Sequence, residues 1–401
     1  MAGSRSREVG PAAPEDVRLR GFPDRATLED AQAWVDRHAG TLGAVDLPLG
    51  GASGRILAAT LACPAPLPRA DRAGIDGYAV RAADTVGASA LGPLTLRLAD
   101  PSTTVAAGAA ALIAAGAALP AGADSILGFD SAQAAGPLLE VIAPVAEGAG
   151  VERAGQQLRA GAPLLPAGRR LGPADLALLA SLGLSRLAVV AAPRVRLIVA
   201  GPKGGAGALD ADGPMLGALV ARDGGVPAAA ASTDLRAALR TAPGACDLAL
   251  VVGRTGTGAD DEAPAALANA GRLERHGIAL SPGGSAGLGA VGELPVLLLP
   301  GDPLACLAAY ELLAGRLIRG LAGRGAALPH RLVEGALVRK LVSTVGVTEL
   351  CQVRLVGDAV EPIGVAEFGG LAAATRGDGF VLVPAALEGY PPGARVTVHL
   401  H

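Results

Sequence analysis

Long apolar runs alternate with helical patterns in the middle of the chain. Three runs are apolar at nearly every position and end in glycine: RVRLIVAG at 194–201, DLALVVG at 247–253 and LPVLLLPG at 294–301. Helical patterns follow them at 213–225, 262–271 and 302–318. Buried strands that alternate with helices predict a parallel sheet that is covered on both faces.

The segments on either side of this region have other patterns. Between predicted helices at 27–40 and 172–183, residues 61–142 contain short apolar runs separated by glycine and proline, which predicts a β-rich insertion. Residues 326–401 hold short, partly alternating runs between turn-rich segments, which predict a compact β domain. Residues 1–26 begin with a polar stretch that lacks an apolar signal core, and we expect a disordered leader there.

Composition narrows the class of protein. Half of the chain is hydrophobic (51%), and a formal net charge of -3 predicts no basic surface for nucleic acid or an anionic membrane. The longest alanine- and glycine-rich run is cut by Pro120 and is too short to span a bilayer. The 4 cysteines lie far apart without a zinc spacing, as in a protein of the reducing cytoplasm. We therefore expect a cytoplasmic protein.

Each predicted strand of the central region leads into a glycine-rich loop. The loops are AGPKGGAG at 200–207, VGRTGTGADD at 252–261 and PGDP at 300–303. Parallel strands bring such loops to one edge of a sheet, where glycine lets backbone N–H groups approach an anion. This pattern favours a crevice for a phosphate-bearing ligand. The alternative is that the glycines only make tight turns, in a chain with 58 of them.

A second candidate site is the stretch PLPRADRAGIDGYAVRAADT at 66–85. It places Asp71 and Asp76 close together in a chain with few charges. A functional site would use these carboxylates on a ligand. The alternative is a charged turn in which Asp76 starts the turn and Asp71 pairs with Arg69 or Arg72.

Several segments together resemble one known family, the molybdopterin molybdenumtransferases that include MoeA and the gephyrin E domain. The resemblance covers roughly residues 27–400 and is carried, in the family's order, by RADRAGIDGYAVRAADT, AGAALPAGADSIL, LLPAGRRLGPADLALLASLG, LDADGPMLGALV and LLLPGDPLACLAAYELL. It implies an α/β multidomain fold with a central doubly wound MogA-like domain. The expected divisions are a leader at 1–26, a linker and dimerisation domain at 27–60 plus 143–190, a β-rich insertion domain at 61–142, the MogA-like molybdopterin-binding domain at 191–325 and a small C-terminal β-barrel domain at 326–401.

The resemblance also implies an activity. Family members insert molybdate into adenylylated molybdopterin with the help of a divalent metal, and they release AMP. They are homodimers whose cleft lies between the central domain of one subunit and the insertion domain of the other. By this resemblance Asp71, Asp76 and Asp124 are catalytic candidates, and Asp71 and Asp76 are candidate ligands of Mg²⁺, which prefers oxygen. The candidate residues for binding molybdopterin are Gly201, Lys203, Asp210, Gly253, Thr255, Gly256, Thr257, Gly258, Asp261, Pro300, Gly301 and Asp302.

The chain departs from the family pattern at charged positions. The family's Thr-Gly-Asp-Glu-Leu is here Ala-Gly-Pro-Lys-Gly at 200–204, and its Gly-Glu-Asp is Gly-Gln-Gln at 155–157. Its Lys-Pro-Gly-Lys-Pro is Ser-Pro-Gly-Gly-Ser at 281–285, so both lysines are absent. Lys203 and Arg254 are candidates to restore positive charge. Two hypotheses follow: a divergent transferase, or a catalytically degenerate protein that binds molybdopterin or the cofactor, or scaffolds a molybdoenzyme or a cofactor-biosynthesis partner.

Three histidines are predicted to lie outside the candidate site. His38, His276 and His330 have no partners by spacing, and we expect them at the surface.

Overall fold

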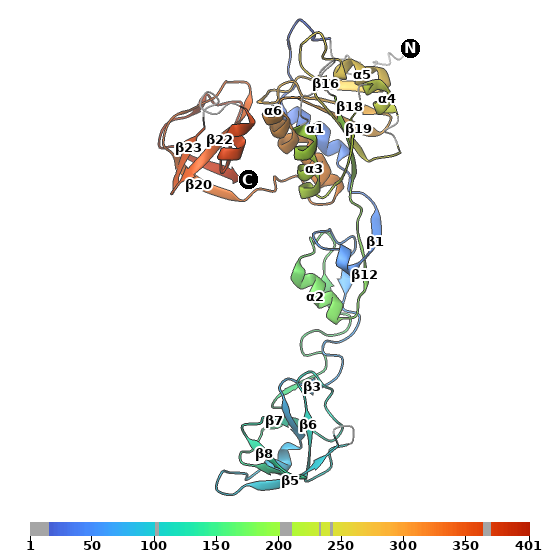
Figure 1. Cartoon of the computed structure of the whole chain (residues 1–401), viewed down its shortest axis with the longest axis vertical. Helices are drawn as coiled ribbons and strands as arrows, with labels where there is room; N and C mark the ends of the chain where they lie inside the picture. Colours follow the sequence, from blue (N-terminus) through green and yellow to red (C-terminus); the bar gives the residue numbers. More distant parts are fainter. Residues whose placement is uncertain (1–15, 101–103, 201–210, 232–233, 241–243, 364–369) are drawn as a thin grey trace, which may run out of the picture. The chain divides into compact units, whose positions relative to one another are not determined.

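The computed structural model describes residues 16–100, 104–200, 211–231, 234–240, 244–363 and 370–401. The chain forms two compact units (Figure 1). The larger unit contains residues 1–46, 54–56 and 188–401, and the smaller unit contains 47–53 and 57–187. The strands β1 (Ala44–Pro48) and β12 (Arg186–Val190) pair with each other.

The larger unit is built on a six-stranded sheet in the order β14-β13-β15-β19-β18-β16. The first four strands are parallel, and β18 and β16 continue the sheet in antiparallel fashion. These strands are β13 (Arg194–Val199), β14 (Val226–Ala231), β15 (Leu248–Val252), β16 (Arg272–His276), β18 (Gly287–Val291) and β19 (Leu294–Leu299). The three apolar runs of the sequence are therefore adjacent parallel strands, as predicted.

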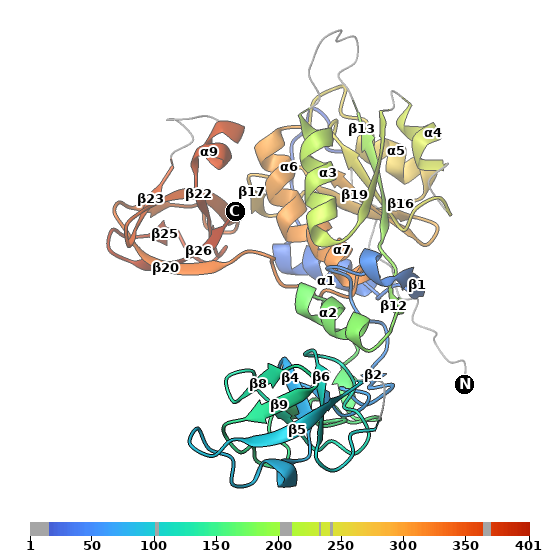
Figure 2. The same ribbon diagram turned by 60° about the horizontal axis from the view of Figure 1, so that its bottom comes forward.

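Helices cover both faces of this sheet (Figure 2). Strand side chains alternate between the faces, so Leu250 and Leu297 join one buried core while Val251 and Leu298 join the other. Helices α1, α3, α6 and α7 contribute to the first core, and α4 and α5 contribute to the second. Their bounds are α1 (Leu28–His38), α3 (Asp212–Asp223), α4 (Leu235–Arg240), α5 (Ala263–Ala270), α6 (Pro303–Ala309) and α7 (Gly315–Leu321). A π-helical turn, η3 (Tyr310–Ala314), joins α6 to α7.

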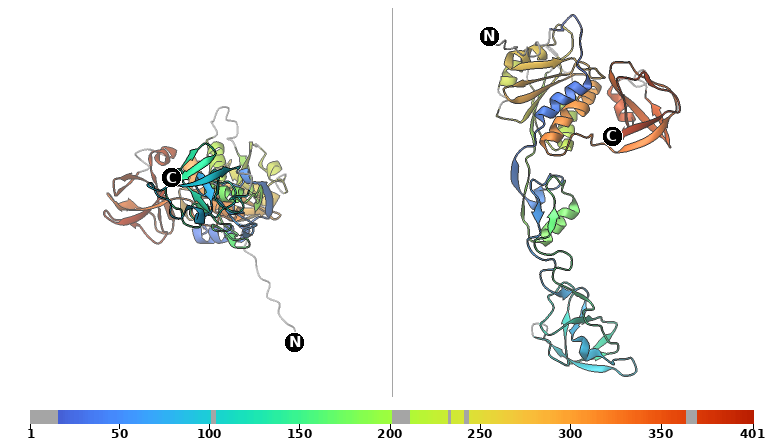
Figure 3. Two further views of the ribbon diagram at one scale, coloured as in Figure 1. Left: turned by 90° about the horizontal axis from the view of Figure 1, so that it is seen from below. Right: turned by 180° about the vertical axis from the view of Figure 1, so that it is seen from behind.

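Helix α1 packs in the central core, although we expected it in the linker domain. Thr27 caps its N-terminus by accepting a hydrogen bond from the Asp30 N–H group. Leu28, Ala31, Trp34 and Val35 then form one buried face that packs with η3 and α7 (Figure 3). The apolar stripe predicts that one face of α1 is buried, but sequence position alone does not show which domain buries it.

The segment before α1 also differs from the expected leader. Residues 16–26 contact the central domain: Val17 is buried and the Leu19 N–H group donates to the Thr257 carbonyl at 2.8 Å. Residues 1–15 lie outside the described part of the chain.

The C-terminal residues form a closed five-stranded barrel. Strands β22, β23, β20, β26 and β24 pair in that order, and β24 pairs back with β22. Their bounds are β20 (Leu332–Leu337), β22 (Thr348–Val356), β23 (Ala359–Pro362), β24 (Gly379–Val383) and β26 (Arg395–Leu400). A short pair and a helix accompany them, β21 (Leu341–Val342), β25 (Gly389–Tyr390) and α9 (Leu371–Arg376). Strand β17 (Leu280–Ser281) extends from the α/β domain and pairs with β22, which ties the two domains together.

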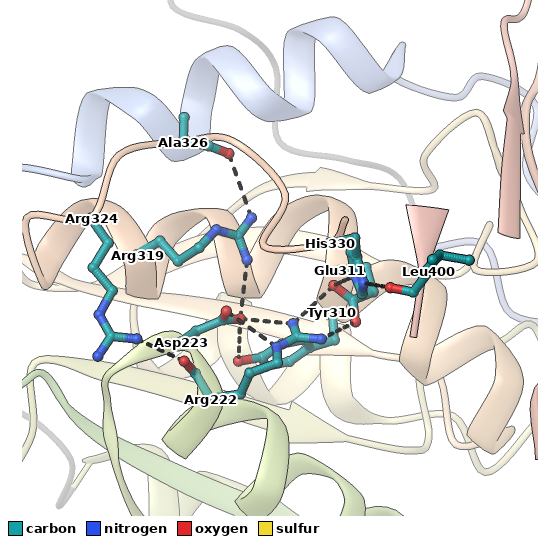
Figure 4. Close-up of polar contacts among 9 residues, drawn as sticks. All are labelled: Arg222, Asp223, Tyr310, Glu311, Arg319, Arg324, Ala326, His330 and Leu400. Carbon is teal, nitrogen blue, oxygen red and sulfur yellow. Dashed lines mark hydrogen bonds and ion pairs between the residues drawn. The ribbon is translucent and has the colours of Figure 1, made fainter. Parts of the chain in front are cut away.

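A buried ionic cluster lies where α3, η3 and α7 meet the segment that leads into the barrel (Figure 4). Asp223 accepts hydrogen bonds from Arg319 and Tyr310, each at 3.0 Å. Glu311 accepts from Arg222 at 2.7 Å, and its other oxygen lies 3.1 Å from His330 Nε2. Burial alone would raise the pKa of Glu311, yet the hydrogen bonds from His330 and Arg222 bring it to about 2. The cluster therefore keeps the Glu311 carboxylate charged in the interior.

The smaller unit contains its own six-stranded sheet in the order β7-β4-β6-β5-β9-β8. The glycine- and proline-rich insertion thus forms β structure, as its pattern predicts. Its elements are β4 (Gly77–Val80), η2 (Ala82–Thr85), β5 (Leu94–Ala99), β6 (Ala109–Ile113), β7 (Ser125–Leu127), β8 (Ala132–Ala135) and β9 (Leu138–Val141). Around it lie η1 (Leu49–Gly51), β2 (Leu61–Ala62), β3 (Arg72–Ala73), β10 (Val151–Glu152), β11 (Pro163–Leu165) and α2 (Pro173–Ser181).

Among the described residues, every helix is too short or too polar to cross a membrane.

Candidate functional site

Two of the predicted glycine loops meet at one edge of the central sheet. Val252 of β15 lies in register with Val199 of β13 and Leu299 of β19, so the three strands end side by side. A side chain on Gly301 would lie only 3.0 Å from the Gly253 Cα atom, and this close approach requires glycine. The predicted residues Gly201, Lys203 and Asp210 lie outside the described residues.

The loop after β15 is held by contacts within the protein. Gly258 donates its N–H group to Asp261 Oδ2 at 2.7 Å, and a side chain on Gly256 would come within 2.7 Å of that same oxygen. Asp261 therefore shapes the loop. Arg254 is only 7% exposed and pairs with Glu262 at 2.8 Å. Because Glu262 neutralises this charge, Arg254 does not restore the positive charge of the missing lysines.

Backbone N–H groups remain available in this loop. The Thr255 carbonyl accepts a hydrogen bond from His276 Nε2, and the Thr257 carbonyl accepts from the Leu19 N–H group, each at 2.8 Å. Within the described residues, the N–H groups of Thr255, Gly256 and Thr257 have no acceptor. Consecutive unpaired N–H groups in a glycine loop are suited to binding an anion.

The loop after β19 starts a helix. Asp302 caps α6 by accepting from the Ala305 N–H group at 2.9 Å, and Pro303 occupies the first turn. Pro300 and Gly301 precede this cap at the same edge of the sheet as Gly253. The conformation of the PGDP segment is thus explained by capping, and Asp302 also lines a cavity.

This cavity, of about 450 Å³, lies between the α/β domain and the barrel. Ser281, Pro282 and Asp302 line it from one side, and Lys340 and Gln352 line it from the barrel. Gln352 is 4% exposed, its Oε1 atom lies 3.0 Å from His401 Nε2, and its own Nε2 atom has no partner among the described residues. A buried amide donor without an acceptor needs a partner that the described residues do not supply, and a bound water molecule is the ordinary one. The sequence did not reveal this donor, because Gln352 and His401 are distant in the chain.

Cys351 lies in the same cavity without the properties of a nucleophile. Burial raises its pKa to about 12, so the thiol stays protonated at neutral pH.

In the smaller unit, backbone N–H groups hold all three catalytic candidates. Asp76 Oδ1 accepts from the Ala115 N–H group, and Asp124 Oδ1 accepts from the Ala82 N–H group, each at 2.8 Å. Asp71 accepts from the Ala154 N–H group and from Arg153, both at 2.8 Å. These two hydrogen bonds, the one from Ala154 first, lower the pKa of Asp71.

The alternative pairing of Asp71 with Arg69 or Arg72 is wrong. Arg69 donates to the Leu182 carbonyl and Arg72 pairs with Glu152, while Arg153 from the following loop reaches Asp71. Strand β3 pairs with β10, and this pairing brings Arg153 and Ala154, which follow β10, next to Asp71.

Most carboxylate oxygens of Asp71 and Asp76 are already hydrogen-bonded, which limits how they could bind a metal. In the described part of the chain, no cluster of three or more His, Cys, Asp or Glu side chains is arranged to hold an ion. Both oxygens of Asp71 are engaged, whereas Asp76 uses one oxygen and is exposed. Mg²⁺ is often bound by one or two carboxylates together with substrate phosphates, and Asp76 fits that use better than Asp71.

The predicted surface histidines all have partners. His276 is 7% exposed and holds the Thr255 carbonyl, and His330 lies in the buried ionic cluster. His38 stacks on Trp34 and lies 2.8 Å from its carbonyl oxygen through Nδ1. The contacts of His276 and His330 come from segments that spacing along the chain does not connect.

The fold and these loops define an α/β multidomain protein of the molybdopterin-binding type. Residues 26–183 match the family model of the MoeA N-terminal region (domain I and II), and residues 198–319 match that of the probable molybdopterin binding domain. The chain is 30% identical over 295 residues to molybdopterin molybdenumtransferase 2 of Mycobacterium tuberculosis, covering 67% of this chain and 73% of the relative. The chain belongs to the MoeA family, as its motifs predicted.

Two further comparisons cover most of the chain. A putative molybdopterin biosynthesis protein of Methanocaldococcus jannaschii is 29% identical over 367 residues, which are 86% of this chain and 89% of that protein. The crystal structure of a molybdopterin biosynthesis MoeA protein from Pyrococcus horikosii superposes with a TM-score of 0.76 at 29% identity. It covers 94% of this chain and 99% of the other. The fold class that we predicted, with its central α/β domain and C-terminal barrel, is confirmed.

Proposed function

We propose that this chain inserts molybdate into adenylylated molybdopterin, with release of AMP, in molybdenum cofactor biosynthesis. The observation that carries the proposal is the loop after β15, whose N–H groups at Thr255, Gly256 and Thr257 have no acceptor among the described residues. Such a loop suits the phosphate groups of this substrate. The relatives named as molybdopterin molybdenumtransferases support the reaction.

The cavity beside the barrel supplies a second subsite. We assign it to molybdate, since Lys340 in its lining adds positive charge. Lys340 takes over part of the role of the lysines that are missing from 281–285. When bound, Mg²⁺ would neutralise charge on the phosphates, and Asp76 would offer it an oxygen ligand.

A homodimer completes the site in this proposal. The acids Asp71, Asp76 and Asp124 belong to the smaller unit, and the glycine loops belong to the larger unit. The cleft would combine the smaller unit of one subunit with the larger unit of its partner. Asp71 would mainly orient the Arg153–Gln157 segment, because both its oxygens bind that segment.

A second candidate function is ligand binding without turnover. The uncharged residues at 281–285 and the neutralised Arg254 favour it, because metal-assisted chemistry on phosphates depends on such charges. Such a protein would hold molybdopterin or the finished cofactor, or serve a molybdoenzyme as a scaffold.

An assay of AMP release separates the two functions. Purified full-length protein is incubated with adenylylated molybdopterin, molybdate and Mg²⁺, and AMP is measured against a reaction without protein. A transferase releases AMP only when molybdate is present. Binding of molybdopterin without any AMP release would support the second function and reject the first.

Asp76→Asn provides the sharpest variant for this assay. Loss of the carboxylate charge should lower the rate of AMP release by on the order of 100-fold, the typical effect of removing one electrostatic group from an active site. Asp84→Asn is the matched control, because Asp84 in the same unit also accepts one backbone N–H group, that of Gly108 at 2.8 Å. Equal rates for the two variants would remove Asp76 from the site.

A further inference from the structure

The N-terminal segment Asp16–Ala26 contacts the loop after β15. It is anchored at one end by the buried side chain of Val17. At the other end, Ala26 donates to the Gly277 carbonyl at 3.0 Å and accepts from the Ala279 N–H group at 2.8 Å. Between these anchors, the Leu19 N–H group donates to the Thr257 carbonyl at 2.8 Å. The segment is therefore attached directly to the candidate ligand-binding loop.

His276, at the end of β16, holds the neighbouring carbonyl of the same loop. Its Nε2 atom lies 2.8 Å from the Thr255 oxygen, and a carbonyl only accepts, so the histidine donates. The ring of Phe22 contacts His276 edge-on, with ring centres 5.0 Å apart. Gly277 allows this contact, because a side chain there would lie 2.5 Å from the Phe22 ring. The segment thus fixes the histidine as well as the loop.

The geometry of the peptide bond links this contact to the direction of the Gly256 N–H group. In a trans peptide the C=O of one residue and the N–H of the next point in opposite directions. When His276 holds the Thr255 carbonyl, it therefore fixes the Gly256 N–H group pointing away from itself. That N–H group has no acceptor among the described residues. In the same way, Leu19 fixes the peptide between Thr257 and Gly258.

We propose that His276 and the segment Asp16–Ala26 form a clamp that positions the Gly256 N–H group for a phosphate of the substrate. This inference rests on the proposed function, and it makes His276 a positioning residue that acts through the loop. Burial lowers the pKa of His276, so the ring is neutral at neutral pH and carries its proton on Nε2.

Among the described residues, a few contacts hold the clamp, so single variants should release it. A cavity of about 210 Å³ separates parts of the segment from α5; Val17, Arg18, Asp261 and His276 are among its lining residues. The hydrogen bonds from Leu19 and His276, together with the anchors at Val17 and Ala26, therefore hold the segment and the loop in place.

The test measures binding of inorganic pyrophosphate, which reproduces the two linked phosphates of adenylylated molybdopterin. Full-length wild type, His276→Leu, His276→Gln and Val17→Asp are titrated by calorimetry without added metal, and each melting temperature is recorded. His276→Leu and Val17→Asp should bind pyrophosphate on the order of tenfold more weakly, the effect of losing one oriented hydrogen bond to an ion. His276→Gln should bind like wild type, because its amide nitrogen replaces Nε2.

His38→Leu is the matched control. His38 also contacts a backbone carbonyl through one ring nitrogen, but that carbonyl belongs to Trp34 of α1 and not to the loop. This variant should leave pyrophosphate affinity unchanged. In the AMP-release assay, His276→Leu should raise KM with little change in kcat, since it disturbs binding of the phosphate rather than the reacting atoms.

Several results would overturn the clamp: no pyrophosphate binding by wild type, equal affinity in His276→Leu and wild type, or a loss that His276→Gln does not restore. If wild type releases AMP but the variants do not differ from it in pyrophosphate affinity, the clamp is rejected and the proposed function remains. Conversely, the expected binding pattern in a protein that releases no AMP would reject only the proposed reaction.

Discussion

His399 and His401 are residues through which the stability of this protein should respond to mild acid. His399 stacks on Phe380, with ring centres 5.0 Å apart, and His401 contacts the buried Gln352. Burial, and after it the nearby His330, lowers the pKa of both histidines below the ordinary value of 6.5. The folded state therefore disfavours their protonated forms.

The free energy of unfolding should fall as the pH drops below about 6.5. In that range the unfolded chain binds protons that the folded chain does not, so stability decreases with falling pH until the folded pKa values are passed. A melting temperature measured at pH 7.5 should exceed that at pH 5.5, and the double variant His399→Asn/His401→Asn should reduce the difference. An unchanged pH dependence in this variant would contradict the assignment.

At the scale of elements, the buried ionic cluster joins α3 to α7. Asp223 is 1% exposed and Arg319 is 3% exposed, so each depends on the other for its solvation (Figure 4). A buried pair adds little stability over an apolar pair of the same shape, but loss of one partner leaves an uncompensated charge. The cluster should therefore be sensitive to single changes.

Asp223→Asn should lower the free energy of unfolding by about 3–5 kcal/mol, because it leaves Arg319 buried without its counter-charge. Urea unfolding followed by fluorescence of Trp34, the single tryptophan, reports on the core that contains α7. Asp247→Asn is the control: its partner Arg194 is 54% exposed, so a loss below about 1 kcal/mol is expected. Equal losses would show that burial does not decide the effect.

At the scale of the whole molecule, the proposed homodimer has a direct test. Asp76→Asn impairs the smaller unit, and Gly256→Ala impairs the larger unit by contact with Asp261. If each cleft uses one unit from each subunit, a mixed dimer has one intact cleft. Co-expression of the two inactive variants should then restore about one quarter of the wild-type rate of AMP release. A rate no higher than that of either variant would contradict the shared cleft.

The sequence predicted the architecture better than the site. The apolar runs that became β13, β15 and β19 were recognisable because buried parallel strands need uniformly apolar side chains. The packing of α1 could not be recognised from the sequence, because its apolar face fits any sheet of sufficient size. The partners of Asp71, His276 and Gln352 were also missed, since each comes from a segment distant in the chain.

The π-helical turn η3 lets the two ends of one continuous helix, α6 and α7, face different neighbours. An α-helix advances each residue by about 100°, so the extra residue of a π turn rotates everything after it by roughly that angle. Helix α6 can then present Leu304 to the cavity beside the barrel while α7 turns Arg319 toward Asp223. Removing one residue from Tyr310–Ala314 would turn the π-helical turn into regular α-helix and rotate α7 relative to α6. Only one of these two contacts would then survive.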